Sequence, residues 1–219
     1  MSRHQATTRR ARTRTSVKVR AALAGALVLG VGATATLAAW NDNEFGTATF
    51  SASVFDTESS VNGTTFADNA TAPGATMTVT AGGFSPDAHR YAFIDVRGKA
   101  NSVSGTLALS GATVTNNPTT APTLGGALQY RAVATAPGVA CTAAAFTTGT
   151  PTFLVGSTAS TVALTTAGST TVPLPAASAS APSTAVRFCF DVYLPINADT
   201  ALQGKGATAT WQITGTSSS

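Results

Sequence analysis

The 219-residue chain contains few of the side chains on which catalysis and metal binding depend. Only 10% of its residues are charged and 7% are aromatic, and it has two histidines and two cysteines. His89 is the only histidine beyond residue 20, so neither a paired-histidine zinc site nor a multi-histidine metal site can be built. No G-x-S-x-G motif and no phosphate-binding glycine loop is present. The sequence therefore predicts a non-catalytic protein without a cofactor or a bound metal.

Basic residues are also scarce beyond the N-terminus. Seven of the 13 lysines and arginines lie before residue 21, which leaves six of them against nine acidic residues and a net charge of −3. These six cations are scattered and form no basic stripe of the kind that binds nucleic acid. We therefore expect no nucleic-acid partner.

The first 39 residues have the pattern of an export signal. Residues 1–20 are basic without a single acid, and residues 21–39 form an uncharged run, largely Ala, Gly and Thr, that ends in small residues. This order is typical of the n-region, h-region and cleavage site of a secretory signal peptide, so we expect a helical signal segment and a secreted or cell-surface product. A permanent transmembrane helix is the alternative, and the uncleaved leader is then the only expected membrane contact. The predicted cleavage region is Leu37, Ala38, Ala39 and Trp40.

Beyond residue 39, short alternating segments recur between turn signals. In Thr47–Val54 the residues Ala48, Phe50, Ala52 and Val54 share one face and hydroxyl residues share the other, which is the period of a half-buried strand. Further strands are expected at Thr76–Thr80, Tyr91–Val96, Ser102–Leu109, Ala127–Ala134, Thr161–Leu164, Ala185–Leu194 and Ala207–Thr214. With no amphipathic helical stretch between them, they predict one all-β domain, residues 40–219, folded as an antiparallel β-sandwich or jelly roll.

Residues 165–184 are rich in Ala, Ser, Thr and Pro. Such low-complexity composition predicts a long surface loop. O-glycosylation of this loop is a second interpretation, which the sequence does not decide.

The two cysteines, Cys141 and Cys189, both lie beyond the leader. Because an exported protein meets an oxidising environment, we expect them to form a disulfide. Alternation along the strand puts Cys189 beside Asp191 and Tyr193, opposite the more apolar face. The bridge is therefore expected to hold the segment around Cys141 over the outer surface of the sheet or across a second layer.

Two groups of residues could take part in catalysis or in cation binding, but structural roles explain them equally well. His89 follows a Pro-Asp turn, and we expect a solvent-facing loop histidine rather than a member of a catalytic triad. The carboxylates of Asp42, Glu44, Asp56 and Glu58 could hold a cation, yet their spacing matches no calcium loop. An exported hydrolase that uses His89 is therefore a third hypothesis only.

The junction Ala38-Ala39-Trp40-Asn41-Asp42, followed by Ala48-Thr49-Phe50-Ser51-Ala52, resembles that of the SipW-dependent exported proteins, the TasA/camelysin-like group. It is closer still to their actinobacterial relatives, the alternate signal-mediated exported proteins. Residues 84–103 and 201–217 are similar to later turns and strands of that family, whereas Gly111 to Val186 show no match. The resemblance implies a jelly roll, cleavage by a signal peptidase of SipW type, and self-association into fibres.

The sequence thus predicts a secreted, non-catalytic structural protein, a subunit of an extracellular or cell-surface fibre or biofilm matrix. In the family it resembles, the N-terminal segment of one subunit completes the sheet of the next. The candidate residues for strand donation are Trp40, Ala48, Phe50, Ala52 and Val54. The alternative is a monomeric exported adhesion or ligand-binding β-sandwich module whose loops, residues 165–184 in particular, contact glycan or the cell envelope.

Overall fold

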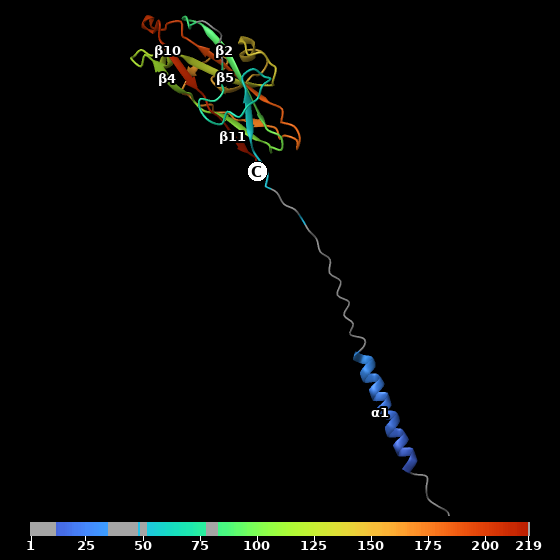
Figure 1. The fold of residues 1–219 in the computed structure, drawn as a ribbon. Helices are drawn as coiled ribbons and strands as arrows, with labels where there is room; N and C mark the ends of the chain where they lie inside the picture. Colours follow the sequence, from blue (N-terminus) through green and yellow to red (C-terminus); the bar gives the residue numbers. More distant parts are fainter. Residues whose placement is uncertain (1–11, 35–47, 49–51, 78–82, 219) are drawn as a thin grey trace, which may run out of the picture. The chain divides into compact units, whose positions relative to one another are not determined.

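The computed structural model describes residues 12–34, 48, 52–77 and 83–218 (Figure 1). The chain separates into two compact units, Met1–Phe50 and Ser51–Ser219. In the first unit, helix α1 spans Arg12–Thr34 and so includes most of the uncharged run. Alanine and leucine are frequent in that run, and both favour helix. Within the described residues, no helix combines the length and the apolar character needed to cross a membrane.

The second unit is mostly β, and its sheets are antiparallel, as the sequence predicts. The larger sheet has the strand order β1-β2-β9-β5-β6, with β7 also paired to β5. Its strands are β1 Thr57–Ser60, β2 His89–Gly98, β5 Gln129–Thr135, β6 Thr152–Val155, β7 Val162–Ala163 and β9 Val186–Tyr193. The long strands β2, β5 and β9 lie at the centre, where the expected alternation is clearest.

The remaining strands form two smaller ladders, β11-β3-β8 and β10-β4. Their bounds are β3 Gly105–Leu109, β4 Thr113–Asn117, β8 Val172–Leu174, β10 Gly206–Thr210 and β11 Ile213–Ser217. Between the ladders the N–H of Ser110 donates to the carbonyl of Gln212 at 2.9 Å, so the chain continues from one ladder into the other. Three short helices complete the unit: α2 Leu124–Ala127, η1 Ala143–Phe146 and η2 Thr200–Leu202.

One apolar core joins the large sheet to the β11-β3-β8 ladder. The central strands contribute Tyr130, Phe188 and Phe190, each at most 1% exposed, and β3 contributes Leu107 and Leu109. These residues alternate along their strands, as expected where one face of a sheet is buried. The opposite face of the large sheet is therefore available to other contacts, which define the candidate site below.

The segment 165–184 departs from the expected surface loop. It contains β8, which pairs with β3, and Val172 and Leu174 are 5% and 1% exposed. The sequence Val-Pro-Leu alternates, so the two apolar side chains enter the core while Pro173 stays on the exposed side at a sheet edge, where proline is tolerated. The surface loop predicted from composition was therefore wrong for Val172, Pro173 and Leu174.

Other strand predictions need correction as well. The expected strand Ala207–Thr214 is divided into β10 and β11 by Trp211 and Gln212, because Trp211 packs on the Tyr130 and Phe190 rings at centroid distances of 5.4 and 5.0 Å. Of the expected strand Thr76–Thr80, only Thr76 and Met77 are described, and neither belongs to a strand.

Candidate functional site on the outer face of the large sheet

The face of the large sheet that points away from the main core is the "outer face". On β2 it consists of alternate residues from His89 to Arg97, because their neighbours Ala92, Ile94 and Val96 point to the core side. By the same alternation, every second residue of β9 and of β5 also belongs to the outer face. The outer-face residues used below are His89, Tyr91, Phe93, Asp95, Arg97, Arg187, Cys189, Asp191, Tyr193, Arg131 and Val133.

Each neighbouring pair of strands in β1-β2-β9-β5 carries one carboxylate directly opposite one arginine. The register partners are Glu58 and Arg97, Asp95 and Arg187, and Asp191 and Arg131. Arg187 donates from Nε and Nη2 to the two oxygens of Asp95, both at 2.7 Å, and Arg131 donates from Nε to Asp191 at 2.9 Å. Asp95 and Asp191 are 1% and 0% exposed, so both pairs are buried and mutually neutralised.

An aromatic ring covers each of these guanidinium groups. Arg187 lies 3.8 Å from the Phe93 ring centroid, Arg131 lies 4.9 Å from that of Phe146, and Arg97 lies 3.7 Å from that of Phe66. These are cation–π distances, and arginine stacks readily on aromatic faces. The Arg187 and Arg131 pairs are thus buried beneath rings, whereas the Arg97 pair stays partly exposed, and all three guanidinium groups are neutralised by a carboxylate.

His89 lies in a strand and not in the loop that the sequence predicts, although its side chain is 36% exposed. It is the first residue of β2, opposite Tyr193, and its Nδ1 lies 2.7 Å from Oδ1 of the fully buried Asp191. A carboxylate paired with arginine only accepts hydrogen bonds, so Nδ1 carries the proton and Nε2 is left available. Within the described residues no side chain bonds to Nε2.

The disulfide between Cys141 and Cys189 is confirmed, with a Cα–Cα distance of 5.5 Å. It holds the segment that includes η1 against the outer face, where Phe146 packs with Val133 and Cys189 in a second, smaller core. The Val139 carbonyl also accepts a hydrogen bond from Nη1 of Arg187 at 2.8 Å. The bridge therefore lies over the outer surface of the sheet, which is one of the two arrangements expected.

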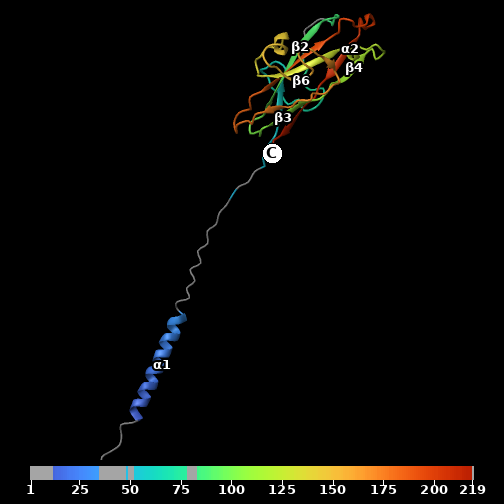
Figure 2. The same ribbon diagram turned by 180° about the vertical axis from the view of Figure 1, so that it is seen from behind.

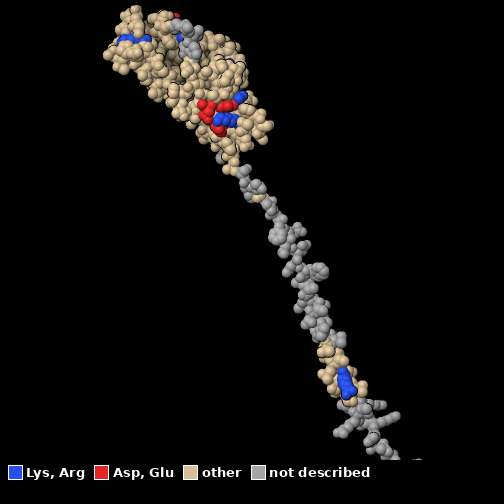
Figure 3. Space-filling view, in the orientation of Figure 1, with Lys and Arg blue, Asp and Glu red and all other residues tan. Residues whose placement is uncertain are grey.

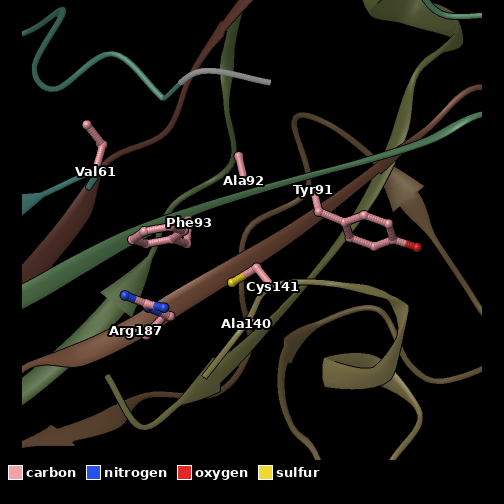
Figure 4. Close-up of a pocket in the computed structure, with 7 residues that line it drawn as sticks. All are labelled: Val61, Tyr91, Ala92, Phe93, Ala140, Cys141 and Arg187. Carbon is pink, nitrogen blue, oxygen red and sulfur yellow. The ribbon is translucent and has the colours of Figure 1, made fainter. Parts of the chain in front are cut away.

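A pocket of about 360 Å³ lies beside the bridge on this face (Figure 4). Figure 4 shows the Phe93 ring against the guanidinium of Arg187, while the Tyr91 hydroxyl points away from that pair. Its lining residues are Val61, Tyr91, Ala92, Phe93, Ala140, Cys141 and Arg187. Burial, followed by the nearby charge of Asp191, raises the pKa of Tyr91, so its hydroxyl is protonated at neutral pH.

The visible charges of the second unit gather mainly in one mixed patch (Figure 3). Lys99 lies 2.9 Å from Asp56 and 3.0 Å from Asp68, and its hydrogen bond lowers the pKa of the Asp68 carboxyl. Glu58 is occupied by Arg97 at 2.7 Å. In the described part of the chain, no group of three His, Cys, Asp or Glu side chains could hold a metal ion.

Several residues proposed for cleavage and strand donation lie outside the described residues: Leu37, Ala38, Ala39, Trp40 and Phe50, as do Asp42 and Glu44. Ala48 and Ala52 are described and exposed, and Val54 is 46% exposed. None of the three belongs to a strand, so the described part of Thr47–Val54 does not form the expected strand. Val54 makes one isolated parallel bridge, to Ser102, and its carbonyl accepts from the N–H of Val103 at 2.8 Å.

Sequence reasoning missed the two buried ion pairs, although a signal was present. Asp95 and Asp191 each interrupt a strand that is otherwise rich in Phe, Ile and Val. A carboxylate in such a strand has to be paired, because an unpaired buried charge is very costly. The partner strand, however, depends on sheet order, which the sequence does not reveal.

Comparison with known protein families, with curated proteins and with solved structures gives no match to this chain. The resemblance of the Ala38–Asp42 junction to the SipW-dependent proteins therefore stays a hypothesis. The function is inferred below from the geometry of the chain together with that hypothesis.

Proposed function

We propose that this protein is a secreted, non-catalytic structural protein, a subunit of an extracellular or cell-surface fibre that grows by donation of the N-terminal strand. Its β domain, in this proposal a jelly-roll sandwich, is released from the signal segment by a signal peptidase of SipW type. The observation that carries the proposal is the exposed run Ala52–Val54, which lies at the start of the second unit and is fixed to the rest of it by one bridge.

The fixed end of this run is well anchored. Phe55 is partly buried, packs against the main core and closely approaches Gly105 and Gly215, where a Cβ atom would collide with its ring. Only glycine leaves room for the ring at these two positions. In this proposal the segment before Val54 pairs with another subunit, while Val54 and Phe55 stay bound to their own domain.

The strand β11 offers an edge to which such a segment can add. It is the last strand of its ladder, and no described strand pairs with its other side. Ser110 donates to Gln212 and Ser218 donates to Ser104, so the N–H groups of the odd-numbered residues 213, 215 and 217 face the open side. Since β11 has no proline and no charged residue, nothing in its sequence protects this edge.

The donor segment and this edge begin at the same end of the domain. Val54 bonds to Val103 and Ser218 bonds to Ser104, and Figures 1 and 2 show the C-terminus beside the chain that enters at residues 52–55. A segment that leaves one subunit here and pairs with β11 of another makes a head-to-tail contact. Such contacts do not close on themselves, so the assembly extends into a fibre.

The test is electron microscopy and sedimentation velocity of the chain that begins at Trp40, over a range of concentrations. We expect filaments or a concentration-dependent ladder of oligomers. A chain that begins at Val54 keeps the bond to Val103 and should remain a folded monomer. Filaments formed equally well by this shorter chain would disprove strand donation.

A matched pair of substitutions tests the acceptor edge. Ser217→Pro removes one of the three outward N–H groups and places a ring where an added strand would lie, whereas Ser217→Ala keeps the N–H. Since an unmet backbone hydrogen bond costs about 1–3 kcal/mol, the proline variant should need roughly tenfold more protein to assemble. Equal assembly of both variants would exclude β11 as the acceptor.

A further inference from the structure

The outer face carries a row of rings outside the main core. His89, Tyr91 and Phe93 occupy alternate positions of β2, and Tyr193 lies opposite His89 on β9. The His89 and Tyr193 rings stack with centroids 4.5 Å apart, and the Tyr91 ring is within 12° of parallel to that of His89. All four side chains are partly exposed, and we name them the aromatic strip.

One end of the strip borders the pocket beside the disulfide. Tyr91 and Phe93 line this pocket, with Val61 and Ala140 supplying apolar contacts and Arg187 supplying N–H groups (Figure 4). The rings of His89, Tyr91 and Tyr193 lie side by side on the sheet, and the Phe93 ring lies apart from that of Tyr91, across the pocket (Figure 4). This arrangement fits a segment of a polymer better than a small molecule that has to be enclosed.

The buried charges around the strip are already neutralised. Asp95 accepts both hydrogen bonds of a bidentate contact with Arg187, and Asp191 accepts one from Arg131 and one from His89. An anionic ligand would therefore meet no free cation at these positions, whereas the exposed carboxylate of Asp87, 3.4 Å from the Tyr193 hydroxyl, can accept a hydrogen bond from a ligand hydroxyl. Complementarity of charge therefore disfavours an anionic ligand.

Hydrogen-bonding groups are nevertheless exposed along the strip. No described residue bonds to Nε2 of His89 or to the Tyr91 hydroxyl, and the Tyr193 hydroxyl has only a long contact of 3.4 Å to Asp87. The buried carboxylate of Asp191 fixes the orientation of the His89 ring. A ligand that brings hydroxyl groups would satisfy these atoms, and a purely apolar ligand would leave them unpaired.

From this combination we infer that the aromatic strip binds a neutral polysaccharide. The C–H faces of sugar rings pack on Tyr91 and Tyr193, while sugar hydroxyls bond to His89 Nε2 and the tyrosine hydroxyls. This binding requires no assembly into fibres and goes beyond the structural role proposed above.

The experiment is co-sedimentation of the full chain with insoluble neutral polysaccharides, namely cellulose, chitin and β-1,3-glucan. A blank without polysaccharide corrects for self-association of each variant. We expect binding to at least one polymer, released by its soluble oligosaccharide and not by the anionic polymer hyaluronate. Tyr91→Ala should weaken binding at least about tenfold, which corresponds to about 1.4 kcal/mol.

Two further variants distinguish the loss of contacts at the strip from a general loss of structure as the cause of weaker binding. Tyr91→Phe keeps the ring and should show an intermediate loss, whereas Phe84→Ala removes a ring that packs against the main core and should bind normally. Circular dichroism checks that each variant is folded. The inference is overturned if no neutral polymer is bound, if hyaluronate or a proline-rich peptide competes fully, or if Tyr91→Ala binds as the unsubstituted chain does.

Discussion

Replacing Asp191 by asparagine tests whether its buried contacts with Arg131 and His89 on the outer face stabilise the fold. The side chain is fully buried and accepts from His89 Nδ1 at 2.7 Å and from Arg131 Nε at 2.9 Å. Asparagine has nearly the same shape but no charge, so Arg131, 8% exposed, keeps its charge without a counter-ion. Loss of one partner of a buried ion pair costs about 3–5 kcal/mol.

Part of this cost is offset by the carbonyls that remain around the guanidinium. Arg131 Nη1 donates to Thr158 at 2.7 Å and to Ser157 at 3.3 Å, and these bonds do not depend on Asp191. We therefore expect a loss toward the lower end of the range, about 3 kcal/mol, for Asp191→Asn. The assay is urea unfolding monitored by far-ultraviolet circular dichroism, with the slope m compared between variants.

The double variant Arg131→Met/Asp191→Leu provides the control for this prediction. It removes both charges, so its loss should be smaller by about 1–3 kcal/mol than the sum of the losses of Arg131→Met and Asp191→Leu measured as single variants. A loss below about 1 kcal/mol for Asp191→Asn, or strict additivity of the two positions, would show that the pair is not formed in solution.

Three other changes have defined outcomes. The Cys141–Cys189 bridge spans 48 residues, so Cys141→Ala/Cys189→Ala should lower the free energy of unfolding by about 4 kcal/mol in urea, and a loss under about 1 kcal/mol would contradict the chain-entropy estimate. Burial raises the pKa of Tyr130 above its ordinary 10.0, so the unfolded chain loses this proton first and the free energy of unfolding should fall as pH rises above 10. Tyr130→Phe should make that fall less steep, and an unchanged slope of stability against pH would exclude this cause. Gly105→Ala would push a methyl group into the Phe55 ring and should lower the thermal midpoint, with a cost of about 1–3 kcal/mol, whereas an unchanged midpoint would mean that the chain relaxes freely there.

The sequence predicts the central strands best because they are long and periodic. Phe188, Phe190 and Val192 alternate with Cys189 and Asp191, and the structure places the first set in the main core and buries the second set on the outer face. The strands that were missed are short or polar: β1 reads TESS and β4 reads TVTNN. Their pairing depends on partners far along the chain, and local composition carries no information about those partners.

The candidate site was harder to predict for the same reason. His89 and Asp191 are about a hundred residues apart, and they meet only because β2 and β9 are neighbours in the sheet. The Pro-Asp turn before His89 suggested a loop, yet β2 begins at His89 itself. The disulfide was easier to predict, since two cysteines allow one intramolecular pairing.

The distribution of the cations narrows the ways in which this unit can recognise a partner. All six lysines and arginines beyond residue 20 already donate to groups of the chain itself. Arg97, Lys99, Arg131 and Arg187 bond to carboxylates, whereas Arg90 and Lys205 bond to backbone carbonyls. Recognition by long-range charge is therefore weak, and in the described part of the unit two surfaces are proposed above to bind a partner: the backbone edge of β11, and the ring faces and hydroxyls of the aromatic strip. These two surfaces use different residues, so loss of assembly in Ser217→Pro with intact polysaccharide binding, and the reverse in Tyr91→Ala, would establish that they act independently.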